Sequence, residues 1–220
     1  MVWQTYDYYF EPTAAYFGCK KASEPLHIQW NPITNKVEVV NYSAGNRTSL
    51  QAKAQILNMD GSVTWERKVN VNSPEDSTTP CIDLQFPKEV SAVHYVKLTL
   101  SGASGLISDN FYLHSIDEGN YQALRQLPRI SLKTDIQTTK NKGEAWNGSV
   151  IIKNNTDTPA LMIRINVLGA TDNEQILPMF YSDNYFSLLP GEKKTVKLHW
   201  NDRDTRGQKP RIIVSGYNVN

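Results

Sequence analysis

The sequence predicts an all-β protein made of two tandem β-sandwiches, with one short helix near its start. Three observations lead to this prediction. Short segments of alternating apolar and polar residues follow one another from Leu26 onward. Groups of Asn, Asp, Gly, Pro and Ser, which favour turns, separate these segments. The same order of strands and turns occurs in both halves of the chain, which indicates two related domains.

The first 25 residues differ from the rest of the chain. Residues 2–4 are typical of the end of an apolar strand, and an aromatic loop follows at 7–12. Thr13 is a suitable N-cap for a short helix over 14–22. This helix should end before Pro25, because a proline disfavours helical geometry in the residue that precedes it. A strand end, a loop and a single helix followed only by strands predict the end of a different domain, joined to the sandwiches.

Seven strands are predicted between residues 26 and 117. They cover 26–30, 36–42, 50–57, 63–71, 81–86, 93–100 and 110–115. Asp60 and Gly61 predict a hairpin turn, because both residue types tolerate positive φ. Residues 72–80 are rich in Ser, Pro, Asp and Thr and predict a loop. Seven short strands with turns between them are typical of an immunoglobulin-like β-sandwich.

The segment 118–129 interrupts this pattern. Tyr121, Leu124 and Leu127 recur at a spacing that suits one or two helical turns, and Pro128 ends them. We expect this segment to be a linker between two domains. The alternative is a long loop inside one larger sandwich.

The second half of the chain repeats the plan of the first. Strands are predicted at 130–137, 145–154, 161–169, 177–181, 194–200 and 211–219. Residues 36–61 and 148–173 match in layout: a strand ends in Asn, a polar turn follows, and a longer alternating strand leads to a turn that contains Asp. The predicted domains are therefore a remnant of another domain at 1–25, a sandwich at 26–117, a linker at 118–129 and a second sandwich at 130–220.

The composition excludes several classes of function. The 23 basic and 22 acidic side chains give a net charge of +1 without a run of like charge. Neither nucleic acid nor a membrane surface is therefore an expected partner. Cys19 and Cys81 belong to no disulfide framework, so free thiols are expected, although pairing stays open. Four Asn-x-Ser/Thr sequons occur in residue types that also favour turns; they begin at Asn41, Asn46, Asn147 and Asn154.

No catalytic or metal-binding constellation stands out. The four histidines lack the spacing of metal ligands, and no nucleophile elbow or phosphate-binding glycine loop occurs. Asp202 and Asp204 are spaced as in a calcium loop but lack the other ligands, so a solvated hairpin is expected. A glycosidase needs two carboxyl groups about 5–10 Å apart across one sugar site, and the sequence nominates no such pair. We therefore expect no metal, cofactor or catalytic residue in this chain.

Aromatic residues are the one feature with binding potential. They gather near the start of the chain and again around the Asp-Asn pair at 183–184. Sugars present C–H surfaces to aromatic rings and hydroxyls to Asp or Asn, so these residues are candidates for the rim of an oligosaccharide site. The candidates are Trp3, Asp183, Asn184 and Tyr185. The alternative for Trp3 is a domain interface. For the other three it is a structural corner at a turn, which we favour.

At both ends the chain resembles one branch of the family 2 glycoside hydrolases. The motif W-Q-x-Y-D-Y-Y…A-Y-F-G-x-K-K-A-x-E-P-L-H, which begins at Trp3, resembles the last strand and helix of the catalytic barrel in exo-β-glucosaminidases and β-mannosidase-like enzymes. The motif D-N-Y-F-S-L-L-P-G-E, which begins at Asp183, resembles a signature of their terminal immunoglobulin-like domain. The resemblance implies that the catalytic glutamates belong to barrel strands before Trp3, so no glutamate of this chain inherits that role.

The resemblance also implies a role and a partner. The chain would be a non-catalytic part of a larger enzyme that hydrolyses terminal β-linked glucosamine or mannose. Its sandwiches would support the catalytic barrel and supply a loop to the substrate rim, and the enzyme class implies a periplasmic or extracellular location. The apolar side chains of residues 1–25 are expected to lie on the first sandwich or to pair with a second copy, giving a dimer.

Two alternatives stay open. The first is an independent carbohydrate-binding or cell-surface adhesion protein made of two sandwiches. The second is the same supporting role in a β-galactosidase or glucuronidase.

Overall fold

The computed structural model describes residues 4–140 and 145–220. Its chain divides into two compact units. The first unit is Lys21–Gln126, and the second unit combines Leu127–Asn220 with the N-terminal residues up to Lys20. The division after Gln126 falls within the segment 118–129.

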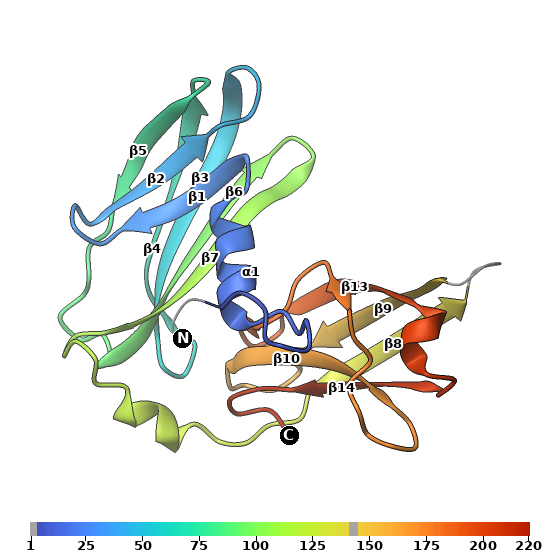
Figure 1. Ribbon diagram of the computed structural model, residues 1–220. Helices are drawn as coiled ribbons and strands as arrows, with labels where there is room; N and C mark the ends of the chain where they lie inside the picture. Colours follow the sequence, from blue (N-terminus) through green and yellow to red (C-terminus); the bar gives the residue numbers. More distant parts are fainter. Residues whose placement is uncertain (1–3, 141–144) are drawn as a thin grey trace. The chain divides into compact units, whose positions relative to one another are not determined.

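The first unit is a sandwich of two antiparallel sheets, with strand orders β1-β2-β5 and β4-β3-β6-β7 (Figure 1). The strands are β1 (Leu26–Asn31), β2 (Lys36–Asn41), β3 (Arg47–Asn58), β4 (Val63–Ser73), β5 (Ser77–Asp83), β6 (Val93–Gly102) and β7 (Gly105–Ser115). Alternate residues of β3 and β6 point inward, so that Ile56 and Leu98 are completely buried between the sheets. A short 3₁₀ turn, η1 (Gln122–Gln126), ends the unit where helical turns are predicted.

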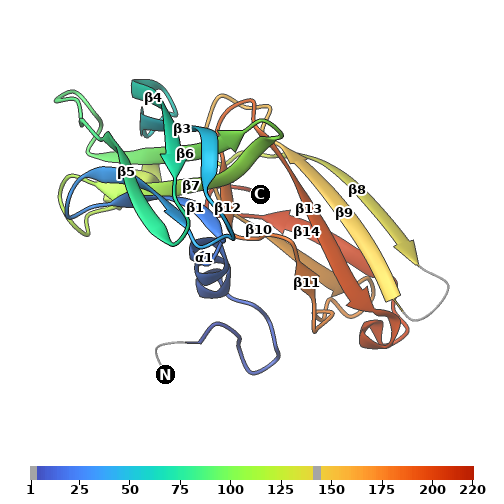
Figure 2. The same cartoon turned by 90° about the horizontal axis from the view of Figure 1, so that it is seen from above.

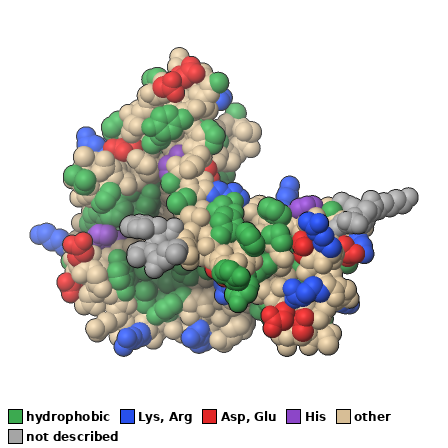
Figure 3. Space-filling model, in the orientation of Figure 1, with side chains coloured by type: hydrophobic (Ala, Val, Ile, Leu, Met, Phe, Trp, Pro, Cys, Tyr) green, Lys and Arg blue, Asp and Glu red, His purple; other side chains and the backbone are tan. Residues whose placement is uncertain are grey.

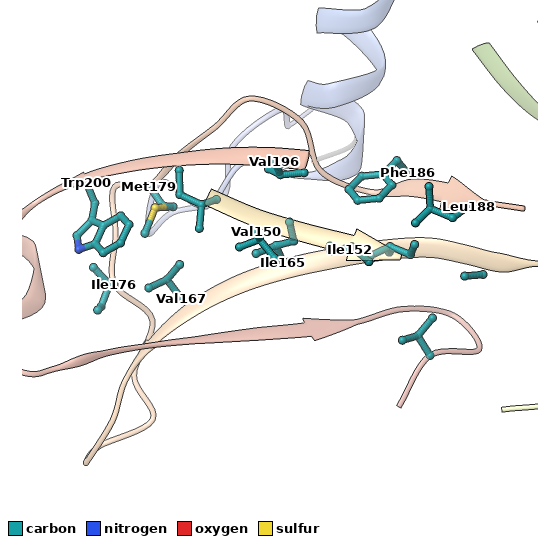
Figure 4. Close-up of a cluster of buried hydrophobic side chains, with 14 of the residues drawn as sticks. Val150, Ile152, Ile165, Val167, Ile176, Met179, Phe186, Leu188, Val196 and Trp200 are labelled. Carbon is teal, nitrogen blue, oxygen red and sulfur yellow. The ribbon is translucent and has the colours of Figure 1, made fainter. Parts of the chain in front are cut away.

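The second unit contains a sandwich of the same kind, with strand orders β12-β10-β14 and β11-β13-β9-β8 (Figure 2). The strands are β8 (Lys133–Lys140), β9 (Ala145–Lys153), β10 (Ala160–Gly169), β11 (Phe180–Tyr181), β12 (Phe186–Leu188), β13 (Lys193–Asn201) and β14 (Pro210–Ser215). Figure 4 shows the core of this unit, a buried cluster to which Val150, Ile165 and Trp200 belong. The prediction of an all-β, immunoglobulin-like fold with one short N-terminal helix is confirmed.

The helix α1 (Ala14–Ala22) lies where it is predicted, but the side chain of Thr13 does not cap its start. The carbonyl of Thr13 accepts the N–H of Tyr16 at 3.1 Å. The hydroxyl of Thr13 points back along the chain, 3.2 Å from the carbonyl oxygens of both Gln4 and Thr5. The side chain of Thr13 therefore fastens the preceding loop rather than capping the helix.

Several strand boundaries differ from the prediction. The predicted loop at 72–80 already contains the start of β5 at Ser77, and this strand ends at Asp83 rather than at residue 86. Strand β5 pairs with β2 and lies at the edge of its sheet, where a proline such as Pro80 is tolerated. The short strand β12 was not predicted, and the expected hairpin near Asp202 is the 3₁₀ turn η2 (Asp202–Thr205).

The internal repeat corresponds to one recurring device, a buried asparagine at the end of the second strand of each sandwich. Asn41 and Asn154 are both fully buried. The side-chain oxygen of each accepts the N–H and the hydroxyl of the residue two positions later, Ser43 and Thr156 respectively. The amide nitrogen of Asn154 donates to the carbonyl oxygens of Thr158 (2.8 Å) and Leu188 (3.1 Å). One side chain thus shapes the turn and ties it to a neighbouring strand.

Replacing this asparagine should weaken the second unit strongly. Asn154→Ala removes the side-chain donor to the Leu188 carbonyl oxygen and the side-chain acceptor of the Thr156 N–H, and each buried group left unpaired costs about 1–3 kcal/mol. We expect the free energy of unfolding, measured by denaturant titration, to fall by roughly 2–4 kcal/mol. The control is Asn155→Ala, because that neighbouring side chain is exposed. Equal stability of the two variants would contradict the assigned role of Asn154.

Candidate functional site

The loop at 183–185, a candidate for a substrate rim, leads into strand β12. Asn184 is 4% exposed. Its side-chain oxygen accepts the N–H of Ile165 at 2.8 Å, and its side-chain nitrogen donates to the Ile165 carbonyl oxygen at 3.0 Å. The amide therefore pairs with β10 as a strand residue would. These contacts support the structural corner, since they engage both ends of the Asn184 amide.

The two neighbours of Asn184 are more accessible. One carboxylate oxygen of Asp183 accepts the N–H of Asn184 at 2.8 Å, and the other lies against the ammonium group of Lys194. The same ammonium group lies 4.9 Å from the ring centre of Phe186. Tyr185 is partly buried and has a φ of 57°, a conformation that is uncommon for a bulky residue. Asp183 and Tyr185 are thus partly exposed, whereas Asn184 between them is buried.

The N-terminal segment packs on the sandwich of the second unit. Phe17 of α1 is buried, and its ring centre lies 6.3 Å from that of Tyr181 and 6.0 Å from that of Tyr185. The ammonium group of Lys20 donates to the Ser182 carbonyl oxygen at 2.7 Å. The apolar side chains of residues 1–25 were expected to lie on the first sandwich or to pair with a second copy. The first expectation is wrong for Phe17, because its ring packs against Tyr181 and Tyr185 in the second unit.

An ion pair joins the loop before α1 to strand β10. The guanidinium group of Arg164 contacts the Glu11 carboxylate, and both side chains are at least two-thirds buried, with 33% and 18% exposed. The guanidinium carbon also lies 6.0 Å from the ring centre of Tyr185. Burial raises the pKa of both Tyr181 and Tyr185, so these phenols stay neutral at neutral pH. We call Glu11, Phe17, Arg164, Tyr181 and Tyr185 the anchor cluster.

The aromatic loop held by this cluster is strongly exposed at its tip. The side chains of Tyr8, Tyr9 and Phe10 are 88%, 69% and 67% exposed. Figure 3 shows hydrophobic side chains on the surface where this loop lies. Trp3, the fourth candidate for a sugar-binding residue, lies outside the described residues.

Two histidines that are distant in the sequence meet in the first unit. Nε2 of His94 lies 3.0 Å from Nδ1 of His114, and Nδ1 of His94 donates to the Ser91 carbonyl oxygen at 2.9 Å. The rings pack against Trp30 and Phe86. Burial lowers the pKa of both histidines, which favours two neutral imidazoles. Only the pairing of β6 with β7 brings them together, so their spacing in the sequence gave no signal.

A second polar cluster surrounds Glu24, next to the end of α1. The Glu24 carboxylate accepts hydrogen bonds from Lys21 (2.8 Å) and Ser108 (2.6 Å) and lies 3.4 Å from His27. Partial burial acts to raise the pKa of Glu24, but these three partners together lower it to about 2. A hollow of about 600 Å³ opens beside Glu24 and continues along the apolar side chains of Leu26, Leu50 and Ile107.

In these clusters Glu11 forms an ion pair, and Glu24 accepts hydrogen bonds. Among the described residues, lowered carboxyl pKa values are found at Glu24, Asp60, Glu66 and Asp202. A general acid of a glycosidase needs a shift in the opposite direction. Residues 4–140 and 145–220 contain no group of three or more His, Cys, Asp or Glu side chains that could hold a metal ion.

The two cysteines are free thiols in the structure. Cys19 is exposed on α1, whereas Cys81 is partly buried in β5, and burial raises its thiol pKa to about 11. Within the described part of the chain, no helix has the length and apolar character that crossing a membrane requires.

Comparison with known proteins places this geometry in context. A family model described as the exo-β-D-glucosaminidase Ig-fold domain matches residues 110–219, half of the chain. Exo-β-D-glucosaminidases of Streptomyces avermitilis and Hypocrea jecorina are each 27% identical to it, over 99% of this chain and 26% of the relative. A mannosylglycoprotein endo-β-mannosidase of Lilium longiflorum is 23% identical over 98% of this chain and 29% of the relative. The chain thus spans about a quarter of the length of these relatives.

Solved structures share the fold. The exo-chitosanase of Amycolatopsis orientalis superposes with a TM-score of 0.92 at 24% identity, covering 99% of this chain and 28% of that one. The β-D-mannosidase of Dictyoglomus thermophilum gives a TM-score of 0.66 at 15% identity, covering 99% and 24%. The arrangement of strands is therefore common to both.

Two neighbouring substitutions should separate the structural from the exposed part of the 183–185 loop. Asn184→Ala leaves the buried N–H and carbonyl of Ile165 unpaired, so we expect a loss of about 2–4 kcal/mol of stability. Asp183→Asn weakens only a partly exposed ion pair and should cost less than about 1 kcal/mol. Denaturant titration of both variants measures the difference, and a larger loss for Asp183→Asn would contradict the assignment.

The His94–His114 pair should make the first unit sensitive to mild acid. The unfolded chain binds protons at the ordinary histidine pKa of 6.5, whereas the folded pair binds them only at lower pH. Its contribution to stability is therefore complete above pH 6.5 and is lost as pH falls through the lowered folded values. Replacing both histidines with Gln should flatten the pH dependence of the unfolding free energy between about pH 7 and about pH 5.

Glu24→Gln provides the control for this experiment. The contribution of Glu24 is present above its ordinary pKa of 4.5 and is lost only as pH falls toward about 2. If the unfolding free energy of the double histidine variant changes with pH as steeply as that of the original chain, the pair does not control acid stability.

Proposed function

The chain belongs to the exo-β-D-glucosaminidase Ig-fold domain family, and from this we propose that it is a non-catalytic accessory region of a family 2 glycoside hydrolase. The complete enzyme removes terminal β-linked glucosamine, or mannose, from an oligosaccharide. The two sandwiches support its catalytic barrel and hold one loop at the rim of the substrate site.

One observation carries this proposal. Alignment with each exo-β-D-glucosaminidase uses 99% of this chain but only about a quarter of the relative. The remaining part of each relative is longer than a catalytic barrel, which typically has about 250 residues. Glu24 is ionised down to about pH 2, so it cannot serve as the general acid of a glycosidase near neutral pH.

The domain boundaries that we propose are those predicted from the sequence. Residues 1–25 are the end of the barrel, 26–117 the first sandwich, 118–129 the linker and 130–220 the second sandwich. Trp3, Asp183 and Tyr185 are the proposed rim residues, with Asn184 fixing the backbone between the latter two. We place the enzyme in the periplasm or outside the cell, in keeping with its class, and its own barrel is the main partner.

An independent carbohydrate-binding module is less well supported. Such modules bind sugars on coplanar aromatic rings, whereas the exposed rings of Tyr8 and Tyr9 stand at 89° to each other. Glucosamine is favoured over galactose or glucuronic acid, because the relatives named above act on glucosaminides and mannosides according to their names.

Activity assays test the proposal directly. We expect no turnover of 4-nitrophenyl β-D-glucosaminide by the isolated chain. The longer protein that contains it should hydrolyse the glucosaminide, and it should lose activity when a barrel glutamate is replaced. Hydrolysis by the isolated chain that disappears on replacing one of its own carboxyl groups would contradict the accessory role.

A further inference from the structure

The loop at 6–12 has a shape that its own sequence does not favour. Phe10 has a φ of 66°, in the left-handed region that bulky residues avoid. Such a conformation costs about 1–3 kcal/mol and persists only where the surroundings hold it. Part of the hold is local: one Asp7 carboxylate oxygen accepts the N–H groups of Tyr9 (2.8 Å) and Glu11 (2.9 Å).

Strand β10 of the sandwich holds the loop from outside, in addition to the backbone hydrogen bonds from Asp7 N–H to Glu11 and from Phe10 N–H to Asp7. Glu11 closes the loop, and its carboxylate contacts the guanidinium group of Arg164. Nε of Arg164 is buried and has no hydrogen-bond partner among the described residues. The buried nitrogen therefore costs stability, and the ion pair with Glu11, together with the nearby Tyr185 ring, offsets that cost. A neutral side chain of similar length would avoid this cost, so stability alone does not explain an arginine here.

The position of the loop suggests what the arginine does. The loop directly precedes α1, and by resemblance it follows the last barrel strand. Loops between a barrel strand and the next helix form the active-site face of barrel enzymes. Phe17 and Lys20 fix the helix on the sandwich, whereas Arg164 acts on the loop itself.

We propose that Arg164 is a positioning residue: through Glu11 it holds the loop at 6–12 in the shape that presents Tyr8 and Tyr9 to the oligosaccharide substrate. The second sandwich thereby contributes to substrate binding through the loop, in addition to its own proposed rim residues Asp183 and Tyr185. The part of this inference that concerns substrate rests on the proposed function. The part that concerns the loop depends on this chain alone.

The loop is tested on the isolated chain by amide hydrogen exchange. In Arg164→Met and in Glu11→Gln, the N–H groups of Tyr9 and Glu11 should exchange about tenfold faster, because the loop opens locally while the sandwich stays folded. The charge-reversed double variant, Glu11→Arg with Arg164→Glu, should restore slow exchange. Arg211→Met is the matched control, since this arginine lies on β14 and contacts Asn173 instead.

Should Arg164→Met lose its fold, Glu11→Gln carries the test, because it leaves β10 unaltered. Unchanged exchange at Tyr9 and Glu11 would overturn the inference and leave the accessory role intact. Exchange that is faster in the double variant than in either single variant would also overturn it.

Kinetics of the longer enzyme test the second part. Arg164→Met should raise KM for a glucosamine oligosaccharide on the order of tenfold, with a smaller change in kcat, because a misplaced loop weakens binding. Arg211→Met should leave both constants unchanged. A mobile loop with unchanged KM would overturn the link to substrate. A longer protein without glycosidase activity would overturn the proposed function instead, and the result for the loop would still stand.

Discussion

The sandwiches depend on buried asparagine side chains at the points where strands end. A strand that leaves a sheet exposes backbone donors and acceptors that water cannot reach in the interior. Asparagine carries both a donor and an acceptor on one short side chain, so it can pair with such groups as another strand would. Asn41 does this in the first unit. In the second unit the same role falls to Asn154, Asn184 and Asn218.

The alternation of residues along the strands was enough to predict most of the fold. Strands such as β3 and β6 bury one face, and their period of two is visible in the sequence. The strands that were not predicted correctly are short or lie at the edge of a sheet. Strand β12 has only three residues, and β5 begins with Ser-Thr-Thr-Pro, a composition that is typical of loops. Tertiary pairing, not local preference, makes these segments strands.

The candidate site was only partly visible in the sequence. The motif around Asp183 could be named because it is continuous, and its turn-forming residues suggested a corner. Glu11 and Arg164 could not be paired, because they are far apart in the chain and Arg164 occupies an ordinary outward position of an alternating strand. The same separation explains why Phe17 was expected on the first sandwich. Which strand a helix covers is decided by long-range packing, which local patterns do not encode.

The buried asparagines have a consequence for producing this chain in a eukaryotic secretory pathway. Asn41 and Asn154 each begin an Asn-x-Ser/Thr sequon. In both sequons the hydroxyl of the Ser or Thr donates a hydrogen bond to the asparagine side-chain oxygen. A glycan attached to Asn154 would replace a hydrogen that the folded chain donates to Thr158 or Leu188. Oligosaccharyl transfer during translocation would therefore compete with folding. A host without this modification avoids the conflict, whereas glycans at the exposed Asn46 and Asn147 would leave the core unaltered.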